Sequence, residues 1–480
     1  MSGVSSIRSN IIWSFVRNFG IRFGSMVVFF VLARILDPSE LGLFATVLAI
    51  LAFFEIIADG GVSDAIVQKK NVSNKDFVTG FYINVSLGFI LSVVIVVFSV
   101  EISSLLNVLG ITDLLRVAAI GLLLNSLSFV PQAFYRRKYD FKWLAYRALI
   151  GATLSGAAGI TLALLGAGPW SLVAQFLTLA FLNALLVWWK KPFVLNNLFD
   201  CTIAVGLIKF GVAISLSKIL YYVTIRGIEL VIVASFGPAA IAVYVMGNRV
   251  VAVLQQLISA VTVDVYLPRF SRLVENKSKL FEVFYTAVEI TSAISFPLFV
   301  GVAILSEDIV FILFGDNGQG AGGILKVLAL LGSIQSVAFY CGSLLNSQGR
   351  PYYSLAFQMV RVLLFVFIFY VFSNQTLLAL VNAYAFVFLC TIPVFFVFTA
   401  KVVGFSLWVV FNKVYPYLFG SSLMYLFSYC LEYFSFFDGF SFFGEFFVSF
   451  CFLFVFYNLF LFFFFKKNYF FVIGNVFNRF

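Results

Sequence analysis

Apolar runs of membrane-spanning length follow one another along the whole chain and are separated by short polar stretches. A helix needs about 20 apolar residues to cross the hydrocarbon core of a bilayer, whereas a transmembrane barrel strand is shorter and alternates. We therefore expect an all-α polytopic membrane protein with about 14 transmembrane helices. The predicted spans cover residues 11–35, 40–67, 77–99, 113–135, 143–166, 169–189, 205–235, 239–264, 282–305, 321–347, 352–373, 376–400, 413–433 and 445–465.

The composition agrees with this pattern. Of the 480 residues, 62% are hydrophobic and 11% are charged, and the mean hydropathy is +1.06. No soluble domain of this length has such a composition. The five cysteines are scattered without the spacing of a metal site, and the chain has no histidine. We expect neither a metal nor a cofactor.

The loops between the apolar runs alternate in charge. The side of the N-terminus carries 20 of the 31 basic residues, whereas the opposite side carries ten acids and only Arg34. Because Lys and Arg collect in cytoplasmic loops, both termini are predicted to be cytoplasmic. The polar start MSGVSSIRSN is unlike a cleaved signal peptide, so the first span is expected to stay in the protein. The net charge of +10 then follows from topology and gives no evidence for nucleic-acid binding.

A hairpin near the N-terminus recurs 200 residues later. Asp37-Pro38 aligns with Gly237-Pro238, and residues 114–117 match residues 324–327 at an offset of 210. Both copies start from the same side, which is typical of transporters with two parallel repeats and a substrate site between them. Chance similarity between apolar helices is the alternative.

These repeats predict two pseudo-symmetric six-helix lobes followed by two extra helices, with the divisions 1–200, 201–400 and 401–480. Every loop is short, so none can hold a soluble catalytic domain. The chain also lacks a Gly-rich phosphate-binding loop of the ATPase type. We therefore expect a transporter that is not driven by its own ATP hydrolysis, rather than an enzyme.

Ionisable side chains inside the predicted spans require an explanation, because charges in hydrocarbon are costly and usually line a wet cavity. Burying many of them without water would cost on the order of tens of kcal/mol, so we predict a hydrated central cavity. The basic excess favours an anionic substrate, and the planar fork of Arg suits phosphate oxygens. The basic residues are Arg17, Arg22, Arg116, Arg147, Lys209, Lys218, Arg226, Arg249, Lys326 and Arg361, and the acids are Glu55, Asp59, Asp64, Glu229, Asp264 and Glu289.

The candidate contacts to an anion in this cavity are the deepest bases and those on the helices of the repeat core. They are Arg17, Arg22, Arg249, Arg361 and Lys218. Other charges have simpler explanations. Arg226 and Glu229 are three residues apart and can pair along one helix face. Four residues near span ends can extend to the interface, namely Arg116, Lys326, Arg147 and Asp64.

The acids allow two interpretations. Glu55 and Asp59 are four residues apart and share a helix face, so they can balance the arginines. Alternatively, Glu55, Asp59 or Glu289 couples transport to a proton or sodium gradient.

Several segments resemble the polysaccharide transporter family of the multidrug/oligosaccharidyl-lipid/polysaccharide exporter superfamily, the Wzx-type flippases. They are the turn ARILDPSELGLFA, the helix end DGGVSDAIVQKK, the segment VPQAFYRRKYDFKWLAYR, and the second-half patterns ELVIVASFGPAAIAVYVMGNRV and PRFSR. The likeness covers residues 5 to about 400. It is closest to the colanic-acid and lipopolysaccharide exporter branch.

The resemblance implies a V-shaped fold of two six-helix lobes that works by alternating access. The implied cargo is an undecaprenyl-pyrophosphate-linked oligosaccharide, for O-antigen or exopolysaccharide, moved from the cytoplasmic to the periplasmic leaflet of the bacterial inner membrane. It implies a monomer in the lipid bilayer, with a polysaccharide polymerase and a chain-length regulator as partners. Related lipid II flippases are thought to hold the pyrophosphate with arginines on spans one and eight, where Arg17, Arg22 and Arg249 lie here. The family's basic position on span two is replaced by acids.

Two other functions remain open. A multidrug or cation antiporter of the same superfamily would require an acidic cavity, which the basic excess argues against. A membrane glycan polymerase or glycosyltransferase would need sizeable outside loops with catalytic carboxylates or arginines, and these loops contain almost no basic residues.

Overall fold

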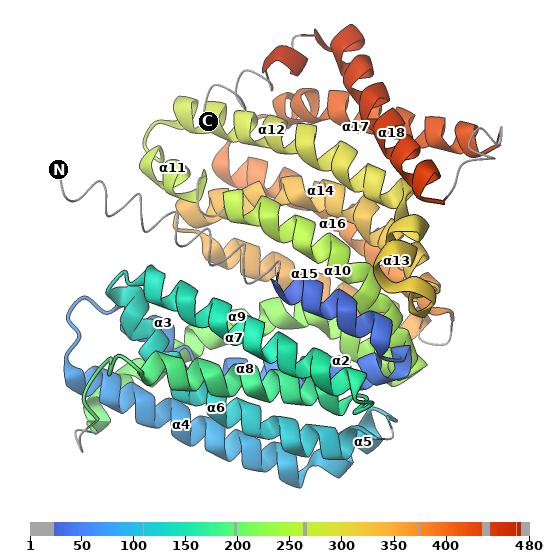
Figure 1. Ribbon diagram of the computed structural model, residues 1–480. Coiled ribbons are helices and arrows are strands. Elements are labelled where there is room, and N and C mark those ends of the chain that lie inside the picture. Colours follow the sequence, from blue (N-terminus) through green and yellow to red (C-terminus); the bar gives the residue numbers. More distant parts are fainter. Residues whose placement is uncertain are drawn as a thin grey trace. The chain divides into compact units, whose positions relative to one another are not determined.

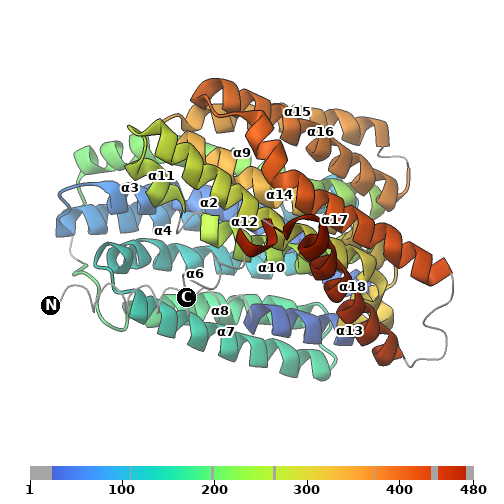
Figure 2. The same ribbon diagram turned by 90° about the horizontal axis from the view of Figure 1, so that it is seen from above.

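The computed structural model describes residues 24–108, 110–195, 199–262, 266–372, 375–433, 442–466 and 468–471. This part of the chain is helical and contains no strand (Figures 1 and 2). After a helix over Gly24–Ile35, the helices are α2 (Pro38–Asp59), α3 (Val62–Gln68), α4 (Asn74–Val97), α5 (Ser99–Leu105), α6 (Ile111–Arg137), α7 (Phe141–Leu164), α8 (Trp170–Trp188), α9 (Cys201–Phe236), α10 (Pro238–Val261), α11 (Leu267–Arg272), α12 (Lys277–Ile304), α13 (Ser306–Phe314), α14 (Ala321–Ser347), α15 (Pro351–Phe372), α16 (Leu377–Val403), α17 (Leu407–Tyr433) and α18 (Phe442–Phe464).

Twelve of the described helices are long and apolar enough to cross a membrane. The expectation of an all-α polytopic membrane protein is therefore confirmed. The helix over Gly24–Ile35 is shorter, and residues 1–23 lie outside the described part. α17 is not among the twelve. The count of 14 spans and the cytoplasmic position of both termini stay predictions.

The chain separates into two compact units, Met1–Val245 and Met246–Phe480. In the first unit, buried side chains of α3, α4, α6 and α9 form one apolar cluster, with Phe193 after α8 at its edge. In the second unit, buried side chains of α12, α14, α16, α17 and α18 form another. The two C-terminal helices thus share the core of the second unit. The predicted divisions at residues 200 and 400 stay a prediction.

The sequence predicts a single span over residues 40–67, and the structure divides it. α2 ends at Asp59, and α3 begins at Val62. Between them, Gly60 and Gly61 have φ angles of +53° and +66°. Glycine adopts this left-handed conformation without the steric cost that a Cβ imposes. Two successive left-handed residues cannot continue a right-handed helix, so the apolar run is broken here.

Helix starts follow the two offsets of the sequence repeat. Pro38 opens α2 and Pro238 opens α10, where the missing N–H of proline costs no hydrogen bond. α6 and α14 have 27 residues each and begin at Ile111 and Ala321, at the second offset of 210.

Candidate functional site

Lys218 on α9 lies between two carboxylates of the first unit. Its Nζ is 2.6 Å from Oδ2 of Asp64 and 3.2 Å from Oδ2 of Asp59. The other oxygen of Asp64 is 3.6 Å from Nη1 of Arg136, near the end of α6. The cluster contains two cations and two carboxylates, so its charges balance. The positive charge of Lys218 is thus neutralised by carboxylates of the protein itself.

Close backbone packing brings these charges together. A Cβ at Gly61 would overlap with the backbone of Gly211 on α9, and a Cβ at Gly211 would overlap with the α2–α3 break. Because neither residue has a side chain, the break can lie directly on α9. Asp59 and Asp64 stand on opposite sides of the break, so both reach Lys218.

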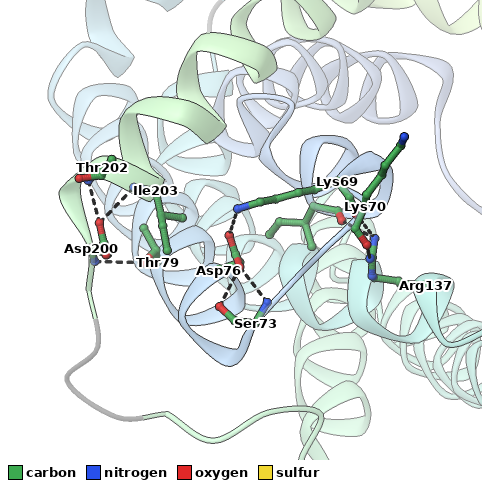
Figure 3. Close-up of polar contacts among 10 residues, drawn as sticks. Lys69, Lys70, Ser73, Asp76, Thr79, Arg137, Asp200, Thr202 and Ile203 are labelled. Carbon is green, nitrogen blue, oxygen red and sulfur yellow. Dashed lines mark hydrogen bonds and ion pairs between the residues drawn. The ribbon is translucent and has the colours of Figure 1, made fainter.

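The end of α3 is held by Arg137, the last residue of α6 (Figure 3). Its guanidinium donates to the carbonyl oxygens of Ile66, Val67, Lys69 and Lys70, at 3.1 Å for Val67. The last carbonyls of a helix have no partner within the helix and carry partial negative charge. Arg137 satisfies them, so α3 is fixed at its C-terminal end.

Two acids nearby, Asp76 and Asp200, already have hydrogen-bond partners at the starts of α4 and α9 (Figure 3). Asp76 in α4 pairs with the ammonium of Lys69 and accepts 2.8 Å hydrogen bonds from the N–H and the hydroxyl of Ser73. Asp200 accepts hydrogen bonds from backbone N–H groups in the first turn of α9, at 2.8 Å for Thr202. Such carboxylates stabilise helix N-termini. Neither acid is left facing the solvent without partners.

Glu55 on α2 is held by a neutral group. Its Oε1 accepts a 2.6 Å hydrogen bond from Nδ2 of Asn125 on α6. Within the described residues, no Lys or Arg lies within ion-pair distance of this carboxyl. Tyr222 on α9 interacts with it electrostatically and donates its hydroxyl to the carbonyl of Ala49 at 2.7 Å. Glu55 therefore differs from the paired acids around it.

Arg226 and Glu229 pair along α9, as their spacing predicts. The Glu229 side chain is 4% exposed, whereas that of Arg226 is 47% exposed. A buried carboxylate is retained only when a cation compensates it. The pair is local, and Arg226 is not left to bind an anion.

Glu289 on α12 is almost completely buried, with 1% of its side chain exposed. Its Oε2 is 2.6 Å from Nζ of Lys413 on α17, and its Oε1 accepts a 2.8 Å hydrogen bond from Nδ2 of Asn468. The sequence places Lys413 at the first residue of the predicted span 413–433 and counts it among the basic residues on the side of the N-terminus. In the structure Lys413 lies within α17, and its ammonium pairs with Glu289 of α12.

Arg361 on α15 has no such compensation. Its guanidinium lies 4.9 Å from the ring centroid of Phe357 and 4.8 Å from that of Phe388, and its Nε donates a 3.1 Å hydrogen bond to the hydroxyl of Thr391. No carboxylate of the described chain pairs with it. The terminal N–H groups of a guanidinium are its strongest anion-binding edge. The two rings and Thr391 fix the plane of this guanidinium.

The other basic residues singled out in the sequence have different outcomes. Arg249 is half-buried on α10. Arg17 and Arg22 lie outside the described residues. Arg147 is only 7% exposed on α7, so the prediction that it extends to the interface is wrong. Arg116, by contrast, reaches a helix end, where it pairs with Asp113 at 3.2 Å.

Sequence reasoning found the charged residues but missed four of their partners. These are Asn125, Arg136, Thr391 and Lys413. Asn125 and Thr391 carry no charge and attract no attention within apolar runs, whereas Arg136 and Lys413 lie at the edges of the predicted spans 113–135 and 413–433. The described residues also include no group of three or more His, Cys, Asp or Glu side chains able to hold a metal ion.

The chain is similar to proteins of bacterial polysaccharide biosynthesis. Residues 31–320 match the model of a family described as polysaccharide biosynthesis protein. Identity is 24% over 342 residues to the lipopolysaccharide biosynthesis protein WzxC of Escherichia coli K12, covering 70% of this chain and 69% of WzxC. It is 24% over 328 residues to the succinoglycan biosynthesis transport protein ExoT of Rhizobium meliloti, covering 68% of this chain and 66% of ExoT.

Among solved structures, the lipid II flippase MurJ in an inward closed conformation has the same fold. The TM-score is 0.76 at 13% sequence identity, covering 95% of this chain and 99% of that chain. At this identity the likeness concerns the fold alone. Together with the sequence relatives, it confirms the resemblance expected from the motifs.

Proposed function

Because the chain belongs to the polysaccharide biosynthesis protein family, we propose that it is a flippase for undecaprenyl-pyrophosphate-linked oligosaccharide repeat units. It is a multi-pass protein of the bacterial inner membrane. The cargo would be a repeat unit of O-antigen or exopolysaccharide, moved from the cytoplasmic to the periplasmic leaflet by alternating access. The names of ExoT, a transport protein, and MurJ, a flippase, support a transport role over an enzymatic one.

The observation that carries this proposal is Arg361. It lies near the middle of α15, about 15 Å from either helix end at 1.5 Å per residue, so its side chain cannot reach the interface. A cation at this depth needs a counter-charge or water. Lys218, Arg226 and Lys413 have carboxylate partners, whereas Arg361 has none within the described chain. A pyrophosphate oxygen fits its terminal N–H edge.

The other basic residues predicted to contact the anion remain part of this proposal. Arg17, Arg22 and Arg249 are the arginines that the family resemblance assigns to the pyrophosphate. Lys218 is a weaker candidate than the sequence indicates, because two carboxylates already neutralise it. The hydrated cavity would then owe its positive potential to few residues.

Glu55 is the acid best suited to couple transport to a proton gradient. Its carboxyl hydrogen-bonds to Asn125 and has no Lys or Arg partner among the described residues, whereas Asp59 and Glu289 are ion-paired. The proposal also includes the three-part organisation, the 14 spans and the cytoplasmic termini. The protein would work as a monomer beside a polymerase and a chain-length regulator.

Purified protein in lipid vesicles tests the proposal directly. The vesicles carry a labelled polyprenyl-pyrophosphate oligosaccharide, and a membrane-impermeant oxidant reports which glycans face outward. In vesicles without protein, about half of the glycan reacts, and the wild-type protein is expected to make nearly all of it reactive. If protein-containing and empty vesicles react alike with and without a proton gradient, the chain is not a flippase for this cargo.

A further inference from the structure

A cavity of about 500 Å³ lies in the first unit between the end of α3 and the start of α9. It is lined from α3 by Ala65, Gln68 and Lys69, and from α9 by Thr202, Ile203, Gly206, Leu207 and Phe210. This volume is typical of a small-ligand site. The lining is mostly apolar, and its polar side chains come from the end of α3 and the first turn of α9.

The cavity continues along α9. A second hollow of about 550 Å³ shares Gly206 and Phe210 with the first and extends over Lys209, Ala213 and Ser217. A Cβ at Gly206 would meet nothing within 4 Å, so the missing side chain leaves this groove open. Together the two hollows form a continuous groove, which we call the α3–α9 groove.

The charged side chains beside the α3–α9 groove differ in whether a partner within the protein already neutralises them. Lys209 lines it and is exposed, Lys70 is exposed in the loop after α3, and Lys75 is exposed in the first turn of α4. Lys69 also lines the groove, but it is paired with Asp76. The acids in the same region are Asp76 and Asp200. Asp76 is bound by Ser73 and Lys69, and Asp200 accepts hydrogen bonds from the first turn of α9. Lys69 and Asp76 neutralise each other, and Lys70, Lys75 and Lys209 leave a net positive charge beside the groove.

The length of α9 places the groove near the membrane surface. Its 36 residues span about 54 Å, whereas the hydrocarbon core is about 30 Å thick. Part of α9 must therefore lie at the headgroup level. We assign this position to the Cys201 end of the helix, because the exposed lysines lie near that end. By the positive-inside rule this is the cytoplasmic leaflet.

We propose that the α3–α9 groove binds an anionic glycerophospholipid of the cytoplasmic leaflet. An acyl chain would lie along Gly206 and Phe210, and the phosphate would contact Lys209. Basic pockets between transmembrane helices on the cytoplasmic side bind anionic headgroups in this way. The lipid is separate from the transported cargo and holds the start of α9 against α3.

Binding of phosphatidylglycerol and phosphatidylcholine to the delipidated full-length protein, measured by native mass spectrometry, tests this proposal. Phosphatidylglycerol is expected to bind more tightly. Lys209→Gln should weaken its binding about fivefold, since each basic residue near a surface contributes about 1 kcal/mol. Gly206→Leu should fill the groove and weaken binding about tenfold or more.

Matched controls separate the groove from general effects. Gly301→Leu adds the same side chain at another helical glycine with open space around it, and Lys401→Gln removes an exposed lysine at the end of α16. Neither should change phosphatidylglycerol binding. Equal binding of the two lipids, or equal losses in the controls, would overturn the proposal. Displacement of phosphatidylglycerol by a polyprenyl pyrophosphate would also overturn it, because the groove would then serve the cargo.

Discussion

The ammonium of Lys413 lies 2.6 Å from Oε2 of Glu289, a carboxylate that is 1% exposed. The two residues belong to α17 and α12, so the pair joins a C-terminal helix to the interior of the second unit. Tyr417 and Met424 of α17 are buried in the same core. This pair makes α17 an integral part of the unit.

Lys413→Met should destabilise the protein by about 2–4 kcal/mol, because it leaves Glu289 buried without a cation while Lys413 itself is partly exposed. Thermal unfolding in detergent measures the loss. The double variant Lys413→Met with Glu289→Gln should recover much of it, since no unpaired charge remains. If Glu289 is instead an ion-coupling residue, Glu289→Gln alone will remove the gradient dependence of transport at unchanged stability.

Arg361→Ala should reduce glycan translocation about tenfold or more, because the oriented guanidinium is lost. Arg361→Lys should restore only part of the rate, since an ammonium has no planar fork. The vesicle assay measures both. Lys401→Gln, at an exposed lysine near the end of α16, is the matched control outside α15. A rate unchanged in Arg361→Ala would remove this residue from the substrate path.

Thr391→Val tests the orientation of Arg361 separately. The substitution keeps the volume of the side chain but removes the oxygen that accepts from Nε. Translocation should fall by a smaller factor than in Arg361→Ala, about threefold to tenfold, because the two phenyl rings still hold the plane. Equal losses in both variants would mean that Thr391 acts on the substrate itself.

Gly61→Ala should lower the free energy of unfolding by about 1–3 kcal/mol. The new Cβ would overlap with the backbone of Gly211, and the φ angle of +66° is unfavourable for alanine. Gly206→Ala on α9 has open space around it and should leave the unfolding midpoint nearly unchanged. Equal midpoints for the two variants would show that α9 does not lie directly on the α2–α3 break.

Glu55→Gln should abolish the dependence of transport on a proton gradient, because the amide cannot gain or lose a proton. Stability should change little, since glutamine can still hydrogen-bond to Asn125. Asp59→Asn is the informative comparison, since Asp59 faces Lys218. Transport that responds to the gradient equally in wild type and Glu55→Gln would assign the coupling to another group.

Local patterns made much of the fold predictable. Apolar length predicts the spans, and the three-residue spacing predicts the pairing of Arg226 with Glu229. The break at Gly60-Gly61 was not predicted, because these glycines lie within an apolar run. Their left-handed conformation is tied to packing against Gly211, far along the chain.

The charge balance of the site could not be predicted for a related reason. Counting charges in spans gives a basic excess but does not say which cations are already paired. Lys218 is 159 residues from Asp59, and Lys413 is 124 residues from Glu289. Such contacts depend on tertiary packing, so the sequence could not separate Arg361 from the compensated bases.

The separation of Glu289 from Lys413 has a consequence for synthesis. At about 5–20 residues per second, the ribosome needs about 6–25 s to make the 124 residues between them. α12 therefore enters the bilayer with a carboxyl group whose partner has not yet been translated. Insertion of α17 supplies the missing ammonium, so the last helices close the second unit during its biogenesis.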